Sequence, residues 1–166
     1  MKSTQPFVVA HDDKPMYRAM YFIACAYANT GTLIESHGEK IDQYAYIFPA
    51  VVCQAFAIEL FLKFFYYLDH HEIRGKQDFT EHTKPGNHHN SKLWDRLQPS
   101  YRQNVARQAK VNEKQFRQQL IDIGDDPFVK WRYVHEQHGI DLLPIGKIKQ
   151  IADALGYTAN EIMKEL

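Results

Sequence analysis

The sequence predicts an all-α fold built around one central helix, and three observations support this prediction. Residues 44–70 are apolar on almost every side of a helical wheel, which is typical of a helix that other helices surround. Helical periodicity and helix-capping residues recur on both sides of this stretch. No internal repeat or low-complexity tract interrupts the 166-residue chain, which is long enough to bury a core by itself.

The chain begins with a loose lead-in at residues 1–12, and residues 13–166 are expected to form a single helical domain. A first helix is expected to begin at Asp13, which can cap it, and to end near Gly38. Its expected inward residues recur at helical spacing and are Met16, Met20, Ile23, Tyr27 and Thr30. The central helix follows, with Pro49 in its first turns.

A polar segment at residues 71–89 follows the central helix and is too long for a simple connection. Five of the nine histidines lie between residues 70 and 89, namely His70, His71, His82, His88 and His89. Their spacing does not match a zinc site, so we expect no bound metal and no cofactor.

Shorter helices are expected beyond this segment, at about residues 90–97 and 101–110. Asn112 can cap a further helix, whose inward residues are expected to be Phe116, Leu120 and Ile121. Residues 124–127 form a break, and residues 128–139 favour an extended or irregular segment.

The C-terminal region is expected to form two helices. The first resumes after Pro144 and stops at Gly156, and a capping box of Thr158 and Glu161 starts a final short helix. Small and apolar residues at 151–162 also fit a helix-turn-helix, which leaves DNA binding as a weaker alternative. A plain helix-turn-helix corner is favoured, because the second helix carries Glu161 and Glu165 against Lys164 alone.

The composition limits the classes of partner that the protein is expected to bind. The 20 basic and 20 acidic residues cancel, so no overall field favours nucleic acid or a membrane surface. Gln54, Glu59 and Lys63 would lie near the middle of a bilayer, so we expect a cytoplasmic protein with no membrane contact. Cys25 and Cys53 lie in apolar helices and are expected to be buried thiols.

The one polar stripe of the central helix consists of Glu59, Lys63, Tyr66 and His70. Their spacings of 4, 3 and 4 place them on one helical face. Glu59 and Lys63 can form an i,i+4 helix pair, and they are expected to be partly buried and therefore to need close polar partners. A cluster of basic residues lies further along the chain and consists of Arg96, Arg102, Arg107, Lys110, Lys114 and Arg117. These residues can follow a phosphate backbone or form a solvated helical face, and the solvated face is favoured.

Three segments resemble motifs of HEPN domains, the higher-eukaryote and prokaryote nucleotide-binding family. Ala57-Ile-Glu-Leu-Phe-Leu-Lys63 resembles an Ala-x-Glu-x-x-x-Lys helix, and His88-His-Asn-Ser-Lys-Leu-Trp94 resembles the Gly-His-x-Leu-x-x-Leu segment paired with it. Residues 128–136 are similar to the Arg-Tyr-x-x-Glu variant of a later motif. The resemblance covers roughly residues 15–155.

This resemblance implies a bundle of four to five helices, here with an additional short C-terminal helix, and commonly a homodimer. Many members are metal-independent ribonucleases or toxins, and others are inactive scaffolds. Arg132 and His138, with five residues between them, match the Arg and His of the active members. RNA or nucleotide contacts are expected from Lys63, His88, Lys130 and Tyr133.

Arg132 and His138 have two interpretations. RNA cleavage without metal needs a base for the 2′-hydroxyl, an acid for the leaving oxygen and a cation for the phosphorane, which imidazole and guanidinium can supply. In the structural interpretation, which is favoured, Arg132 bridges a carboxylate such as Glu59 or Glu136. The sequence therefore predicts either a ribonuclease of a toxin or defence system, or a non-catalytic module that binds a nucleotide or a partner protein.

Overall fold

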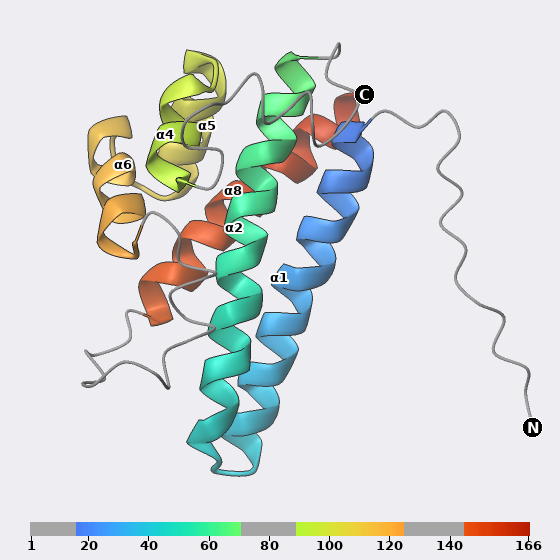
Figure 1. The fold of residues 1–166 in the computed structure, drawn as a ribbon, viewed down its shortest axis with the longest axis vertical. Coiled ribbons are helices and arrows are strands. Elements are labelled where there is room, and N and C mark those ends of the chain that lie inside the picture. The colour runs from blue at the N-terminus through green and yellow to red at the C-terminus, as the bar shows by residue number, and fades with distance from the viewer. Residues whose placement is uncertain (1–15, 71–88, 125–144) are drawn as a thin grey trace, which may run out of the picture.

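The computed structural model describes residues 16–70, 89–124 and 145–166, and these parts are helical, with no strand among them. The all-α prediction is thereby confirmed. In chain order the elements are α1 (Met16–Lys40), the short 3-10 helix η1 (Tyr44–Tyr46), α2 (Ile47–Asp69), α4 (Asn90–Arg96), α5 (Pro99–Gln108), α6 (Glu113–Asp122) and α8 (Ile145–Glu165) (Figure 1).

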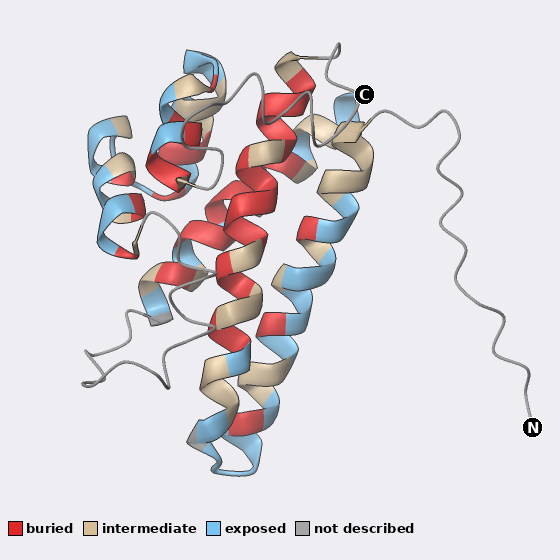
Figure 2. Ribbon diagram, in the orientation of Figure 1, coloured by how far each residue is buried: buried red, intermediate tan, exposed pale blue. Residues whose placement is uncertain are grey.

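α2 is the centre of the fold, as its composition predicts. α1 packs along one side of it, α8 crosses a second side, and α4 covers a third (Figure 1). Most α2 residues are buried from Ala50 to Leu68 (Figure 2). Because neighbouring helices cover α2 on several sides, apolar residues all round its surface are energetically favourable.

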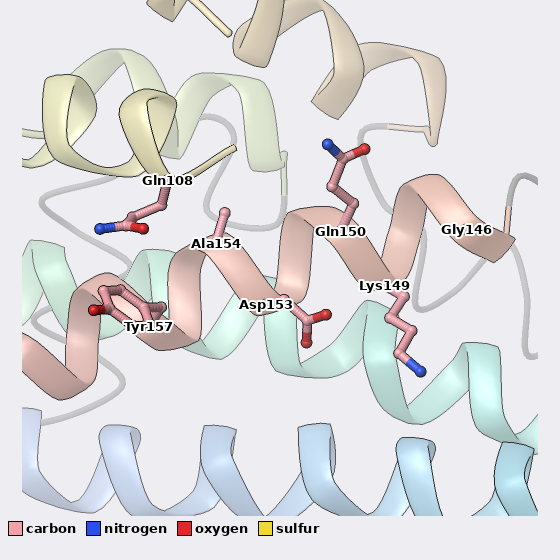
Figure 3. A pocket seen from close by; sticks show the side chains of 7 residues that line it. All are labelled: Gln108, Gly146, Lys149, Gln150, Asp153, Ala154 and Tyr157. Atoms are coloured by element: carbon pink, nitrogen blue, oxygen red, sulfur yellow. The ribbon is translucent and has the colours of Figure 1, made fainter. Parts of the chain in front are cut away.

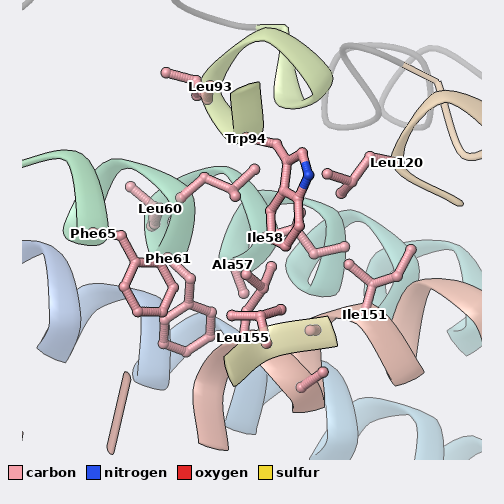
Figure 4. Close-up of a cluster of buried hydrophobic side chains, with 14 of the residues drawn as sticks. Ala57, Ile58, Leu60, Phe61, Phe65, Leu93, Trp94, Leu120, Ile151 and Leu155 are labelled. Carbon is pink, nitrogen blue, oxygen red and sulfur yellow. The ribbon is translucent and has the colours of Figure 1, made fainter. Parts of the chain in front are cut away.

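One part of the core lies where residues of α2, α4, α6 and α8 come together. Trp94 of α4 and Leu120 of α6 approach Ile58 of α2, and Leu155 of α8 lies beside Phe61 (Figure 4). The Trp94 ring also lies 4.6 Å from that of Phe116 in α6. Burying such side chains contributes roughly 1.5–3 kcal/mol each, so this cluster holds the four helices together.

α1 and α2 approach each other closely because small residues face α2. A Cβ added at Gly31 would lie 2.8 Å from Cγ of Gln54 and 3.0 Å from the carbonyl oxygen of Ala50. The buried Gln54 donates from Nε2 to the carbonyl oxygen of Ala28 (3.0 Å) and to Oγ1 of Thr32 (3.1 Å). These bonds satisfy the amide nitrogen and tie the two helices together.

The inward face of α1 differs from the prediction. Met16 and Met20 pack against the core as expected, but Ile23 and Tyr27 are 43% and 38% exposed. Ala24 and Gly31 are buried instead. The prediction chose the larger side chains for the core, whereas the close approach of α2 selects the smaller ones.

α8 is one continuous helix, so the expected break at Gly156 and the separate short C-terminal helix are both wrong. Buried residues recur along α8 on both sides of Gly156, which keeps the helix intact: Ile148, Ile151, Ala152, Leu155 and Ala159. Gly156 serves packing, since a Cβ there would lie 3.1 Å from Cζ of Phe61. Thr158 donates from Oγ1 to the carbonyl oxygen of Ala154 (2.9 Å) and does not cap a helix.

This continuity also removes the basis of the DNA-binding alternative. A helix-turn-helix needs a turn between its two helices, and residues 151–162 lie within a single helix.

The short helices agree well with the prediction. α4 occupies the expected residues, and α5 begins with Pro99 at its first position, two residues before the expected start. Asn112 caps α6, with a reciprocal capping box that Gln115 completes. Phe116 is buried as expected. Ile121 was expected inward but is 37% exposed, because the inward face continues from Leu120 to the fully buried Ile123.

α2 is long and apolar enough, by length and composition, to cross a membrane. Within the protein, 61% of its most apolar window is buried by other residues. The central helix of a helical bundle has the same composition, so the expectation of a cytoplasmic protein without membrane contact stays a prediction. The expected cap Asp13 and the segment at residues 128–139 lie outside the described residues.

Candidate functional site

The polar stripe of α2 is present and its members interact in pairs. Lys63 Nζ lies 2.5 Å from Oε1 of Glu59, one helical turn away. The Glu59 side chain is 6% exposed and that of Lys63 is 15% exposed, so the pair is largely withdrawn from water. Glu59 is thus paired with Lys63 on its own helix. The expected structural pairing of Glu59 with Arg132 stays a prediction, because Arg132 lies outside the described residues. One turn further, the rings of Tyr66 and His70 lie 4.4 Å apart.

The C-terminal end of α2 contains a second polar contact. The hydroxyl of Tyr101 on α5 hydrogen-bonds to Asp69, the last residue of α2. Burial of Tyr101, and then the negative charge and hydrogen bond of Asp69, raise the pKa of its phenol to about 12. The Tyr101 ring also lies 5.4 Å from that of Phe65. This end of the polar stripe is thus the place where α5 is joined to α2.

The other predicted site residues cannot be placed on the fold. Arg132 and His138, the expected catalytic pair, lie outside the described residues, as do the remaining predicted contact residues: His88, Lys130, Tyr133 and Glu136. Lys63 is described, and its charge is offset by Glu59. Whether Lys63 also contacts a ligand stays a prediction.

Two members of the basic cluster are joined to carboxylates between helices. Arg117 of α6 makes a two-pronged contact with Asp95 of α4, at 2.7 Å for both nitrogen–oxygen pairs. Arg102 of α5 lies 3.1 Å from Glu113 of α6. These pairs connect the three short helices, so this part of the cluster fits a surface held by ion pairs better than a phosphate-binding track.

A hollow between α5 and α8 was not predicted from the sequence (Figure 3). Its volume is about 400 Å³, and it is lined by Gln108, Gly146, Lys149, Gln150, Asp153, Ala154 and Tyr157. The α8 members recur every three or four residues and so lie on one face of that helix. The sequence contained this pattern, but the break expected at Gly156 divided it.

Charged side chains lie on the side of this hollow that is nearest to α1. Lys149 and Asp153 extend from α8 on that side (Figure 3), and Lys149 Nζ lies 2.9 Å from Oε2 of Glu35 on α1. Burial raises the pKa of the Asp153 carboxyl, and Glu35 raises it further, while Lys149 acts in the opposite direction. The hollow therefore offers a cation, a carboxyl group, two amides and a phenol, which suit a small polar molecule.

A smaller hollow of about 250 Å³ adjoins the α1–α2 connection and is lined in part by Glu35, the ion-pair partner of Lys149. Asp42 on its edge has a φ of 54°. Residues 16–70, 89–124 and 145–166 contain no group of three or more His, Cys, Asp or Glu residues that could hold a metal ion. The histidines at 71, 82 and 88 lie outside these ranges, so the absence of a metal stays a prediction.

No family model, no curated protein and no solved structure matches the chain.

Proposed function

We propose that the chain is a HEPN-like, cytoplasmic homodimer that cleaves RNA phosphodiesters without a metal ion. One observation carries the proposal furthest. α2, with the Ala57-to-Lys63 motif, packs directly against α4, which holds the end of the second motif. Leu93 and Trp94 of that second motif are buried in the core against α2. The two segments that resemble HEPN motifs thus lie together in space, as a shared fold requires.

The proposed chemistry assigns roles to both groups of the predicted pair. His138 removes the proton of the 2′-hydroxyl, whose oxygen attacks the adjacent phosphorus. The bond to the 5′-oxygen breaks as that oxygen receives the proton from the His138 imidazolium. Arg132 stabilises the additional negative charge on the phosphorane through its planar guanidinium. The products are a 2′,3′-cyclic phosphate and a 5′-hydroxyl, which balance the atoms of the substrate.

A second candidate function is a non-catalytic module that binds a nucleotide or a partner protein, such as an antitoxin-type partner. It is favoured by the ion pairs of three described basic residues that a phosphate backbone could otherwise contact. Lys63, Arg102 and Arg117 all contact carboxylates, so their charges are offset within the protein. A surface that holds an RNA backbone usually offers unpaired cations.

RNA cleavage in the presence of EDTA separates the two functions. The full chain is incubated with labelled single-stranded RNA, alongside Arg132→Ala, His138→Ala and the control Lys164→Ala. Lys164 lies outside the basic cluster, and its exposed side chain pairs with Glu161 on the same helix, so its loss should leave the rate unchanged. Each catalytic substitution should lower the rate at least about 100-fold. Cleavage by Arg132→Ala equal to that of the wild type would leave only the binding function.

A further inference from the structure

The outer face of α1 carries large apolar side chains. The small residues Ala24 and Gly31 face α2. Tyr21 and Tyr27 contact rings of α2, but other large side chains of α1 are exposed. Phe22 is 63% exposed and Leu33 is 71% exposed. Much of α1 on the side away from α2 is exposed (Figure 2). An amphipathic surface helix places most of its large apolar side chains inward, so it is unusual that no helix among the described residues buries Phe22 or Leu33.

The same face carries no charge. No Asp, Glu, Lys, Arg or His occurs from Ala19 to Ile34, which is about 24 Å of helix. Thr30 lies on this face and donates its hydroxyl to the carbonyl oxygen of Ala26 (2.8 Å), so its donor is already satisfied. Apart from the side-chain amide of Asn29, the face can therefore lose water with little polar cost.

Its residue sizes are complementary about Ala26. In a helix of 3.6 residues per turn, six exposed positions share this face: Phe22, Ile23, Ala26, Asn29, Thr30 and Leu33. If two copies of α1 cross antiparallel at Ala26, Phe22 meets Thr30 of the copy and Ile23 meets Asn29. Leu33 likewise meets Ala19. Each large side chain then opposes a smaller one, which favours close packing.

We propose that this face of α1 binds a second copy of the same chain, antiparallel and across a two-fold axis at Ala26. A two-fold contact places each residue near the axis against the same residue of the other copy. Any charge there would therefore meet a charge of the same sign. The uncharged centre of the face fits such a contact. The α1–α2 hairpin of each copy would then form half of a four-helix layer. This inference rests on the homodimer of the proposed function and supplies its surface.

Cross-linking tests the position of the axis. The Ala26→Cys and Leu33→Cys variants of the full chain are treated with a short thiol-to-thiol cross-linker. Ala26→Cys should be captured as a covalent dimer. Leu33→Cys should not, because the two copies of that residue lie about 21 Å apart along the helices. The wild type controls for Cys25 and Cys53, whose thiols are half-buried with pKa values raised by burial.

Sedimentation velocity over a series of concentrations tests the dimer itself. The wild type should change from monomer to dimer, and Ala26→Arg and Ala26→Glu should each remain monomeric. A mixture of these two variants should recover the dimer, because opposite charges then meet at the axis. Ile121→Arg on α6 is the matched control and should dimerise as the wild type does, since Ile121 is also an exposed apolar residue.

A monomeric wild type at every concentration, or equal cross-linking of Ala26→Cys and Leu33→Cys, would overturn this proposal. So would binding of the monomer to neutral lipid vesicles through the same residues. RNA cleavage is measured separately on the same samples. Cleavage without a dimer would overturn only the proposed α1 interface. A dimer without cleavage would overturn only the proposed ribonuclease activity.

Discussion

The phenol of Tyr101 on α5 is hydrogen-bonded to the carboxylate of Asp69, the last residue of α2. Burial and the adjacent charge raise the pKa of Tyr101 to about 12, against about 10 for an unperturbed tyrosine. Between these two values the unfolded chain loses the phenolic proton and the folded chain keeps it. The free energy of unfolding must therefore fall as pH rises from about 10 to about 12.

Tyr101→Phe should remove this part of the pH dependence. Below pH 10 the variant should lose about 1 kcal/mol of stability, because the Asp69 carboxylate loses a hydrogen-bond donor. Above pH 10 its stability should fall less steeply than that of the wild type. Urea unfolding at a series of pH values measures both effects, and parallel curves for the two proteins would contradict the assigned contact.

The ion pair of Glu59 and Lys63 can be tested by a double-mutant cycle. Lys63→Met should lower the free energy of unfolding by about 2–3 kcal/mol, because it leaves a largely buried carboxylate without its cation. Adding Glu59→Gln to that variant should restore most of the loss, since no buried charge then remains. Additive losses in the double variant would show that the two side chains act independently.

Gly31 is expected to tolerate no side chain. Gly31→Ala should destabilise the protein by about 2 kcal/mol, because its Cβ would meet Gln54 and the Ala50 carbonyl group. Gly146→Ala on α8 is the matched control, since nothing lies within 4 Å of its added Cβ. That control should gain roughly 0.5 kcal/mol from helix propensity. Equal thermal midpoints for the two variants would mean that α1 and α2 do not pack this closely.

Asp153 should make the protein less stable at neutral pH than a neutral residue would. Burial raises the pKa of its carboxyl, so the folded chain holds the proton more tightly than the unfolded chain. This contribution is fully present below the unfolded pKa and is lost as pH rises through the folded pKa. Asp153→Asn should therefore match or exceed the wild type in stability near pH 7. A clear loss of stability in that variant, measured by urea unfolding, would argue against this assignment.

The elements that were predicted correctly are those whose structure depends on residues close together in the sequence. The apolar run of α2, the Asn112 cap of α6 and the proline that starts α5 all depend on neighbours along the chain. Gly156 was misread because its local preference to end a helix is outweighed by the buried residues on both sides of it. Tertiary packing of this kind cannot be deduced from propensity alone.

The contacts of the candidate site divide in the same way, into local contacts that the sequence predicts and long-range contacts that it does not. The Glu59–Lys63 contact follows from a spacing of four residues within one helix and was predicted. The contact of Asp69 with Tyr101 and that of Glu35 with Lys149 join residues far apart in the chain, and no local pattern indicates either one. The outward direction of Phe22 and Leu33 likewise depends on how closely α2 approaches α1.

The central proposal is that the protein cleaves RNA without a metal ion, and that the 2′-hydroxyl of the RNA itself attacks the phosphorus. The most direct measurement uses an RNA in which one nucleotide at a mapped cleavage position is replaced by its 2′-deoxy form, with EDTA present. The linkage after that nucleotide should resist cleavage while cleavage elsewhere continues, and Arg132→Ala should cut no linkage. Cleavage at the deoxy position, or no cleavage by the wild type beyond that of Arg132→Ala, would contradict the proposal.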